Sequence, residues 1–150
     1  MFFISCKDLM LYNQFYLLNF NVYMFLFVYG TLLTTEYNHR TIKDSKLIGE
    51  GNIYGKLFDI GNYPALKEGK NIIIGELYDI DDLTLKNCDQ LEGYNNDDPD
   101  NSPYVRKLIT VFLEKKELCA FVYYCNFDTS NYKEIESGNY KEYMNDQRKK

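Results

Sequence analysis

The sequence lacks residues that several common functional sites require. It contains no Trp, a single His and three Pro in 150 residues, and its four Cys include no C-x-x-C pair. Zinc sites and disulfide frameworks depend on closely spaced Cys or His residues, so neither is indicated. The pattern fits a cytoplasmic protein, and we interpret Cys119 and Cys125 as small core hydrophobes.

Basic charge is also scarce. The chain has 17 Lys and Arg against 22 Asp and Glu, which gives a net charge of -5 at pH 7. A surface of this sign is poorly suited to neutralising phosphates, so we expect no nucleic-acid partner. The acid pairs Asp81-Asp82 and Asp97-Asp98 lack the spacing of metal ligands and fit helix capping and loop solvation.

A long uninterrupted apolar run is absent too. Residues 1–23 are apolar and aromatic but are broken by polar side chains such as Lys7 and Asp8. A membrane-spanning helix needs about 20 mostly apolar residues, and a signal peptide begins with a basic region, so neither secretion nor membrane insertion is expected. We interpret residues 1–23 as an extension of doubtful status. It is a translated upstream segment or a wrongly chosen start, an added strand or helix, or a weak membrane-facing arm.

Apolar periodicity predicts the elements of one domain. Leu85, Cys88 and Leu91 fall on one face of an expected helix, which Asp81 caps and Gly93 ends. Strands are expected over residues 24–29, 46–58, 72–80, 104–113 and 118–126, and short helices over residues 37–43, 82–91 and 133–146.

Consecutive strands outnumber alternations of strand and helix in this order. We therefore predict an α+β fold, with a small mixed or antiparallel β-barrel of about five or six strands and about two or three short flanking helices. The strand over residues 46–58 should be bent or bulged, because three Gly interrupt it. Residues 95–103 are rich in Asp, Asn and Pro and should form an exposed, mobile loop.

The first buried strand stops at the turn Val28-Tyr29-Gly30-Thr31-Leu32. A Gly at this point allows backbone conformations closed to other residues. Successive N–H groups after such a turn converge on an anion or a developing oxyanion. Alone, the pattern is typical of ordinary structure.

Glu92 is expected at the carboxyl end of the helix, where the macrodipole disfavours negative charge. This placement should raise its pKa, and a neighbour such as Tyr94 would add desolvation, as suits a general base near neutral pH. A solvated Glu at a helix end is the ordinary alternative. The lone His39 lacks Ser or Cys partners and is interpreted as a local hydrogen-bonding group rather than a base.

Motifs spread along residues 24–143 resemble the gamma-glutamylcyclotransferase-like family in their order and approximate spacing. They are Val28-Tyr29-Gly30-Thr31-Leu32, Asn38-His39, Gly61-Asn62-Tyr63-Pro64-Ala65-Leu66, Gly75-Glu76-Leu77-Tyr78-Asp79-Ile80-Asp81, Leu91-Glu92-Gly93-Tyr94, Tyr104-Val105-Arg106, Ala120-Phe121-Val122-Tyr123 and Ser137-Gly138-Asn139-Tyr140. This span is the expected family domain, and residues 144–150 would be a frayed basic tail.

The resemblance implies a small β-barrel and an enzyme that cleaves a gamma-glutamyl amine or peptide, releasing 5-oxoproline and a free amine without a metal or cofactor. Glu92 would be the catalytic acid/base. The substrate-binding residues would be Tyr29, Gly30, Thr31 and Leu32, with Tyr104 and Tyr123 as further lining residues. The partner would be a small gamma-glutamyl molecule, and the resemblance leaves dimerisation open. A non-catalytic small-ligand-binding or interaction module on the same fold is the alternative.

Overall fold

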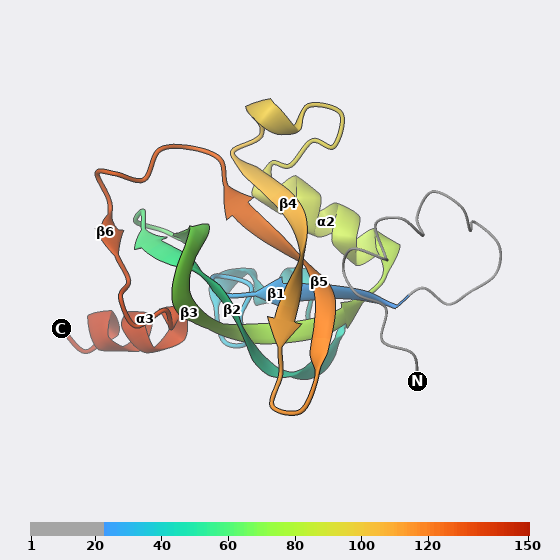
Figure 1. Cartoon of the computed structure of the whole chain (residues 1–150), viewed down its shortest axis with the longest axis horizontal. Coiled ribbons are helices and arrows are strands. Elements are labelled where there is room, and N and C mark those ends of the chain that lie inside the picture. The colour runs from blue at the N-terminus through green and yellow to red at the C-terminus, as the bar shows by residue number, and fades with distance from the viewer. Residues whose placement is uncertain (1–22) are drawn as a thin grey trace.

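The computed structural model describes residues 23–150 (Figure 1), so the interpretation of residues 1–22 lies outside it. The strands are β1 (Met24–Val28), β2 (Lys46–Asp59), β3 (Pro64–Ile80), β4 (Tyr104–Phe112), β5 (Glu117–Cys125) and β6 (Lys133–Glu134). The helices are η1 (Tyr37–Thr41), α2 (Asp82–Glu92), η2 (Pro99–Asn101) and α3 (Tyr140–Arg148), of which η1 and η2 are single 3₁₀ turns.

The strands β1 to β5 close into a barrel. Their order is β3-β1-β5-β4-β2, and a further pairing of β2 with β3 completes the ring. β1 runs parallel to β5, whereas the other pairs are antiparallel. The short β6 adds to the edge of β2. The predicted α+β fold with a small mixed β-barrel is therefore confirmed.

β2 and β3 form a long hairpin that curves around the barrel (Figure 1). The register between them shifts at Leu47/Gly49 and at Gly55/Lys56. Such irregularities bend a strand, as the glycines of this segment predicted. β3 begins at Pro64, earlier than the predicted start at residue 72. The prediction missed its first half because residues 67–71 are polar or Gly and half-buried or exposed, so they do not read as an apolar run.

The inner face of the barrel carries a continuous apolar core. Cys125 is part of this core, but Cys119 is only half-buried, so the interpretation as a core hydrophobe holds for Cys125 alone. The fully buried core side chains of the strands include Leu26, Phe27, Ile53, Leu57, Leu66, Ile73, Leu77, Val111 and Val122.

Helix α2 begins and ends as predicted. The Asp81 carboxylate accepts the N–H of Thr84 at 2.7 Å, and Gly93 closes the helix with φ 67° in the left-handed region. Of the three residues predicted to share one face of the helix, Leu85 and Cys88 are buried in the core, whereas Leu91 is 42% exposed and borders a pocket.

The carboxyl-terminal region differs from the prediction. Helix α3 begins at Tyr140 rather than near residue 133, because β6 intervenes, and it extends to Arg148. Residues 144–148 are therefore helical rather than a frayed tail, and the guanidinium of Arg148 contacts Glu36. Within the part of the chain that the structure describes, no helix is long and apolar enough to cross a membrane.

Candidate active site

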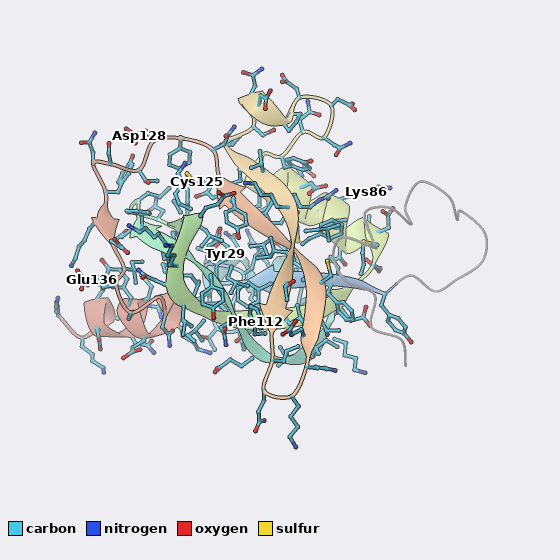
Figure 2. All side chains as sticks on the ribbon, in the orientation of Figure 1. Tyr29, Lys86, Phe112, Cys125, Asp128 and Glu136 are labelled. Atoms are coloured by element: carbon cyan, nitrogen blue, oxygen red, sulfur yellow. The ribbon has the colours of Figure 1, made fainter. Side chains whose placement is uncertain are left out.

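A pocket of about 330 Å³ opens where β1 ends and faces the carboxyl end of α2. Tyr29, at the start of the turn after β1, lies in the interior of the molecule (Figure 2). The pocket is lined by Phe27, Val28, Tyr29, Gly30, Thr31, Leu32, Asn38, Tyr63, Pro64, Gln90, Leu91, Glu92, Gly93, Pro103, Tyr104, Tyr123 and Phe127.

All of the site residues proposed from the sequence border this one pocket. They are Tyr29, Gly30, Thr31, Leu32, Glu92, Tyr104 and Tyr123. The turn and the helix end are about sixty residues apart in the chain, and the closed barrel brings them together because β1 and α2 both adjoin β3. The sequence could indicate both features but not that they meet.

Hydrogen bonds from η1 hold the turn from behind. The N–H of Asn38 donates to the carbonyl of Thr31 at 2.9 Å, and its side-chain amide donates to the Thr31 hydroxyl at 2.9 Å. The ring of His39 lies 2.9 Å from the carbonyl of Leu32 through Nδ1. His39 is thus a local hydrogen-bonding group, as predicted, and it borders the turn rather than the pocket.

Gly30 is required by close packing. A Cβ at this position would lie 2.5 Å from Cγ of Pro64, far inside van der Waals contact. The φ of Gly30 lies outside the left-handed region. Among the described residues, the glycines with a positive φ are Gly61, Gly93 and Gly138. The expectation that Gly30 supplies an unusual backbone conformation is corrected: it gives room to Pro64, the first residue of β3.

The turn also has polar groups available for a ligand. The N–H of Leu33 donates to the carbonyl of Gly30. Among residues 23–150, no acceptor is found for the N–H groups of Gly30, Thr31 and Leu32. Thr31 is half-buried at the pocket wall. Buried N–H groups are nearly always paired in proteins, so these three fit a site that binds an anionic or carbonyl oxygen.

Glu92 lines the same pocket as the turn. It is half-buried, and its carboxylate has no hydrogen-bond or ion-pair partner among the described residues. Burial raises the pKa of Glu92 to about 7. The sequence predicted this direction mainly from the helix macrodipole, whereas the structure assigns it to desolvation. Near neutral pH such a carboxyl both accepts and donates a proton.

The tyrosines around Glu92 are bonded within the protein. Tyr29 donates its hydroxyl proton to the carbonyl of Tyr123 at 2.6 Å, and Tyr104 donates to the carbonyl of Pro64 at 3.0 Å. Burial, and then the charge of Glu92, raise the pKa of Tyr29 and of Tyr104. These side chains therefore stay neutral and shape the pocket mainly with their rings.

Asp89 was missed by the sequence reasoning. Its carboxylate accepts the hydroxyl proton of Tyr123 at 2.6 Å and forms an ion pair with Arg106. Since it precedes Glu92 by one helical turn, it ties the carboxyl end of α2 to β4 and β5. The i, i+3 spacing of Asp89 and Glu92 was the available signal, because residues three apart share a helix face.

Metal-binding and cationic side chains do not contribute to this pocket. Over residues 23–150, no group of three or more His, Cys, Asp or Glu side chains is arranged to hold a metal ion. Glu92 is the one Asp, Glu, Lys or Arg among the lining residues. The described pocket therefore combines a single carboxyl, a turn rich in unpaired N–H groups and an aromatic wall.

Comparison with known proteins identifies the family. The family model described as gamma-glutamyl cyclotransferase, AIG2-like, matches residues 26–142. The chain therefore belongs to the gamma-glutamyl cyclotransferase, AIG2-like family, as its motifs predicted.

Individual relatives agree with this assignment. MJ1514 of Methanocaldococcus jannaschii is 37% identical over 79% of this chain and 97% of its own length. Gamma-L-glutamyl-butirosin B gamma-glutamyl cyclotransferase of Niallia circulans is 44% identical over 46% of each chain. The crystal structure of YkqA from Bacillus subtilis superposes with a TM-score of 0.69 and 28% identity, covering 86% of this chain and 44% of that one. This chain thus spans less than half the length of the last two.

Proposed function

We propose that this chain is a cyclotransferase that cleaves a gamma-glutamyl amine or peptide into 5-oxoproline and a free amine. The observation that carries the proposal is the position of Glu92, whose pKa burial raises to about 7, in the same pocket as the turn of residues 29–32. Family membership supports the same class of reaction, and the name of the Niallia circulans relative specifies a gamma-glutamylated compound.

The reaction begins with binding of the glutamyl end of the substrate at the turn. We assign the unpaired N–H groups of Gly30, Thr31 and Leu32 to an oxygen of the substrate, either of its α-carboxylate or of its δ-carbonyl. Tyr104 and Tyr123, which line the same pocket, would enclose the glutamyl part of the substrate against the turn. Binding the substrate in a bent conformation lowers the activation barrier by on the order of 7 kcal/mol, because the reacting groups are already held close to each other.

Glu92 then carries the proton. In its ionised form it removes a proton from the substrate α-ammonium, and the freed amine attacks the δ-carbonyl carbon to close a five-membered ring. The tetrahedral intermediate collapses as the bond to the leaving nitrogen breaks, and the protonated Glu92 gives its proton to that nitrogen. The regenerated carboxylate then removes the second proton from the ring nitrogen, which leaves the lactam N–H, and passes it to the released amine, which departs as an ammonium ion. The proton balance closes within one carboxyl, so the proposed chemistry calls for neither a metal nor a cofactor.

The test is to incubate the purified protein with a panel of gamma-glutamyl amines and dipeptides and to measure 5-oxoproline. We expect release by the wild type, with or without EDTA, and none above background from Glu92→Gln. Retained turnover in Glu92→Gln would remove Glu92 from the mechanism. Release from no member of the panel would favour a small-ligand-binding module on the same fold.

Loss of activity in Glu92→Gln should not reflect unfolding. Because the folded-state pKa of Glu92 lies above the unfolded value near 4.5, burial of the carboxylate destabilises the fold increasingly from pH 4.5 up to about 7. Glutamine removes this penalty. After allowance for the half-exposed position, we expect the variant to be more stable by about 1 kcal/mol at pH 8 and equal to wild type at pH 4, measured by denaturant unfolding.

A further inference from the structure

The segment between the turn and η1 contains a strained residue. Thr35 has φ 75°, and it is the one non-glycine residue of the described chain with a positive φ. A β-branched residue is disfavoured in this region and persists there only where its surroundings hold it. Thr35 itself is exposed, so the restraint must come from the residues on either side.

Glu76 on β3 holds the residue before Thr35. One oxygen of its carboxylate accepts the backbone N–H of Thr34 at 2.9 Å, and the Thr34 hydroxyl lies 3.0 Å from the same oxygen. The hydroxyl of Tyr78 donates to it as well, at 2.8 Å. Lys141, in the first turn of α3, approaches the other oxygen at 3.9 Å.

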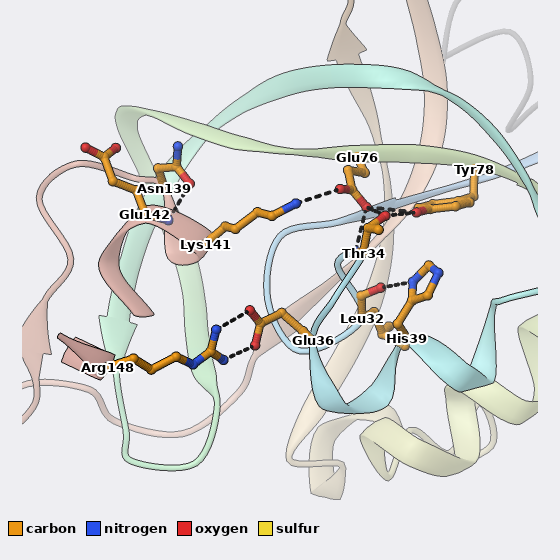
Figure 3. Close-up of polar contacts among 10 residues, drawn as sticks. All are labelled: Leu32, Thr34, Glu36, His39, Glu76, Tyr78, Asn139, Lys141, Glu142 and Arg148. Carbon is orange, nitrogen blue, oxygen red and sulfur yellow. Dashed lines mark hydrogen bonds and ion pairs between the residues drawn. The ribbon is translucent and has the colours of Figure 1, made fainter. Parts of the chain in front are cut away.

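Glu36 is the residue after Thr35, and it is held by a partner at the far end of α3. The Glu36 side chain is only 4% exposed, yet it carries a carboxylate. Both of its oxygens accept from the guanidinium of Arg148, at 2.9 and 3.3 Å. Figure 3 shows Lys141 and Arg148 extending from the same helix toward Glu76 and Glu36. A buried carboxylate needs such a partner, because leaving it unpaired is costly.

The contacts continue to the pocket. Residues 34–36 lead directly into η1, and η1 holds the turn through the bonds of Asn38 to Thr31 and of His39 to Leu32. We propose that helix α3 positions the substrate-binding turn, with Arg148 as the positioning residue that acts through Glu36. The inference rests on the proposed function, because that proposal makes the turn the substrate-binding segment. The positioning of this turn is assigned to residues that do not line the pocket.

The first test compares Arg148→Ala with Lys149→Ala. Lys149 is the next residue of the chain and pairs with Asp146 at 3.6 Å, and both of these side chains are more than half exposed. Lys149→Ala is therefore a matched control, because it also removes one cation from the helix end but breaks only a weak surface pair. We expect amide hydrogen exchange at the bonded N–H groups of Leu33, Thr34 and Glu36 to be about tenfold faster in Arg148→Ala and unchanged in Lys149→Ala. Equal exchange in the two variants would overturn the proposal.

The second test uses turnover of the gamma-glutamyl substrate. In Arg148→Ala we expect KM to rise about tenfold, because a misplaced turn binds the glutamyl end poorly. The pH dependence of kcat/KM should stay in place, since Glu92 is untouched. Arg148→Lys keeps the charge but loses the bidentate contact with Glu36, so its KM should lie between those of the wild type and Arg148→Ala. A KM equal to that of Lys149→Ala would count against the role of Arg148.

A further variant tests the proposal even if Arg148→Ala loses stability as a whole. Thr34→Val keeps the shape of the side chain and removes its hydroxyl contacts with Glu76 and Tyr78. It should raise exchange and KM in the same direction, whereas wild-type values in a folded Thr34→Val would contradict the proposed path. If exchange responds to Arg148→Ala but the wild type turns over no substrate, the positioning of the turn stands and the cyclotransferase proposal fails.

Discussion

At the scale of the residue, the proposed site depends on one carboxyl, that of Glu92, whose environment differs from that of an ordinary surface Glu. The other acidic side chains of α2 are paired: Asp82 with Lys86, and Asp89 with Arg106. Glu92 alone has no partner among the described residues and lies against an aromatic wall. Burial without a cation is what raises its pKa, and this follows from its surroundings rather than from its residue type.

The raised pKa of Glu92 predicts a pH profile. Only the ionised form accepts a proton from the substrate, so kcat/KM should rise with pH through about 7 and then reach a plateau. The measurement is initial-rate kinetics between pH 5 and 9 on one gamma-glutamyl amine, within the range where the protein stays folded. A profile that is already flat at pH 5 would show that Glu92 titrates like an exposed Glu and would argue against its role.

Gly30 predicts a steric effect. Gly30→Ala would place a methyl group 2.5 Å from Cγ of Pro64, so the turn or the Pro64 ring must move. We expect unfolding to be easier by about 1 to 3 kcal/mol and turnover to fall by more than tenfold. Gly61→Ala is a control without this steric clash, since nothing lies within 4 Å of a Cβ there, although its φ of 109° adds strain. Wild-type turnover in Gly30→Ala would show that the turn tolerates the shift.

At the scale of the element, α2 is the part of the fold that presents Glu92. Its first turn is fixed by the cap of Asp81, and its last turn is fixed by Asp89, which contacts β4 through Arg106 and β5 through Tyr123. The helix is thus anchored at both ends, and the anchor at the carboxyl end lies beside the pocket. Because Glu92 follows Asp89 by one turn, small shifts of this anchor move the carboxyl.

Asp89→Asn tests this anchor. It leaves Arg106 without a counter-charge, and since the side chains of this pair are 20% and 16% exposed, breaking it should cost about 3 kcal/mol of stability. kcat should fall about tenfold as Glu92 loses its position. Asp82→Asn on the same helix is the control: its pair with Lys86 is about 70% exposed, so at most about 1 kcal/mol should be lost. Similar effects of the two substitutions on kcat would refute the anchor.

At the scale of the whole molecule, the described residues complete the barrel. β1 begins at Met24 and has both of its neighbours, β3 and β5, so closure of the ring requires no other segment. The family model begins at residue 26 and ends at residue 142. We therefore propose residues 24–143 as the family domain, with the remainder of α3 supporting the turn as inferred above.

A chain beginning at Met24 tests this boundary. We expect it to fold with a melting temperature within a few degrees of the full chain, because the core side chains of the described residues already fill the barrel. Its kcat/KM should be unchanged. Thermal unfolding by circular dichroism, together with the 5-oxoproline assay, checks both. Aggregation or loss of turnover in the shortened chain would assign residues 1–23 a part in the fold or the site.

The sequence predicted the elements of the fold better than their limits. A continuous apolar run marked β1, runs rich in strand-forming residues marked β4 and β5, and a capping Asp and a terminal Gly marked α2, because these signals are local. The first half of β3 and the position of α3 were misplaced, since they are set by pairing with β2 and by packing on the loop of residues 33–36 rather than by their own composition.

The sequence by itself determined the class of fold, the family and the residues proposed for the site, because motif order and apolar periodicity are written along the chain. Only the tertiary structure decided that Glu92 lines the same pocket as the turn of residues 29–32, that Gly30 makes room for Pro64, and that Asp89 pairs with Arg106 and Arg148 with Glu36. The physical reason is closure of the barrel. It brings distant segments into contact, and desolvation, steric fit and ion pairing arise only from those contacts.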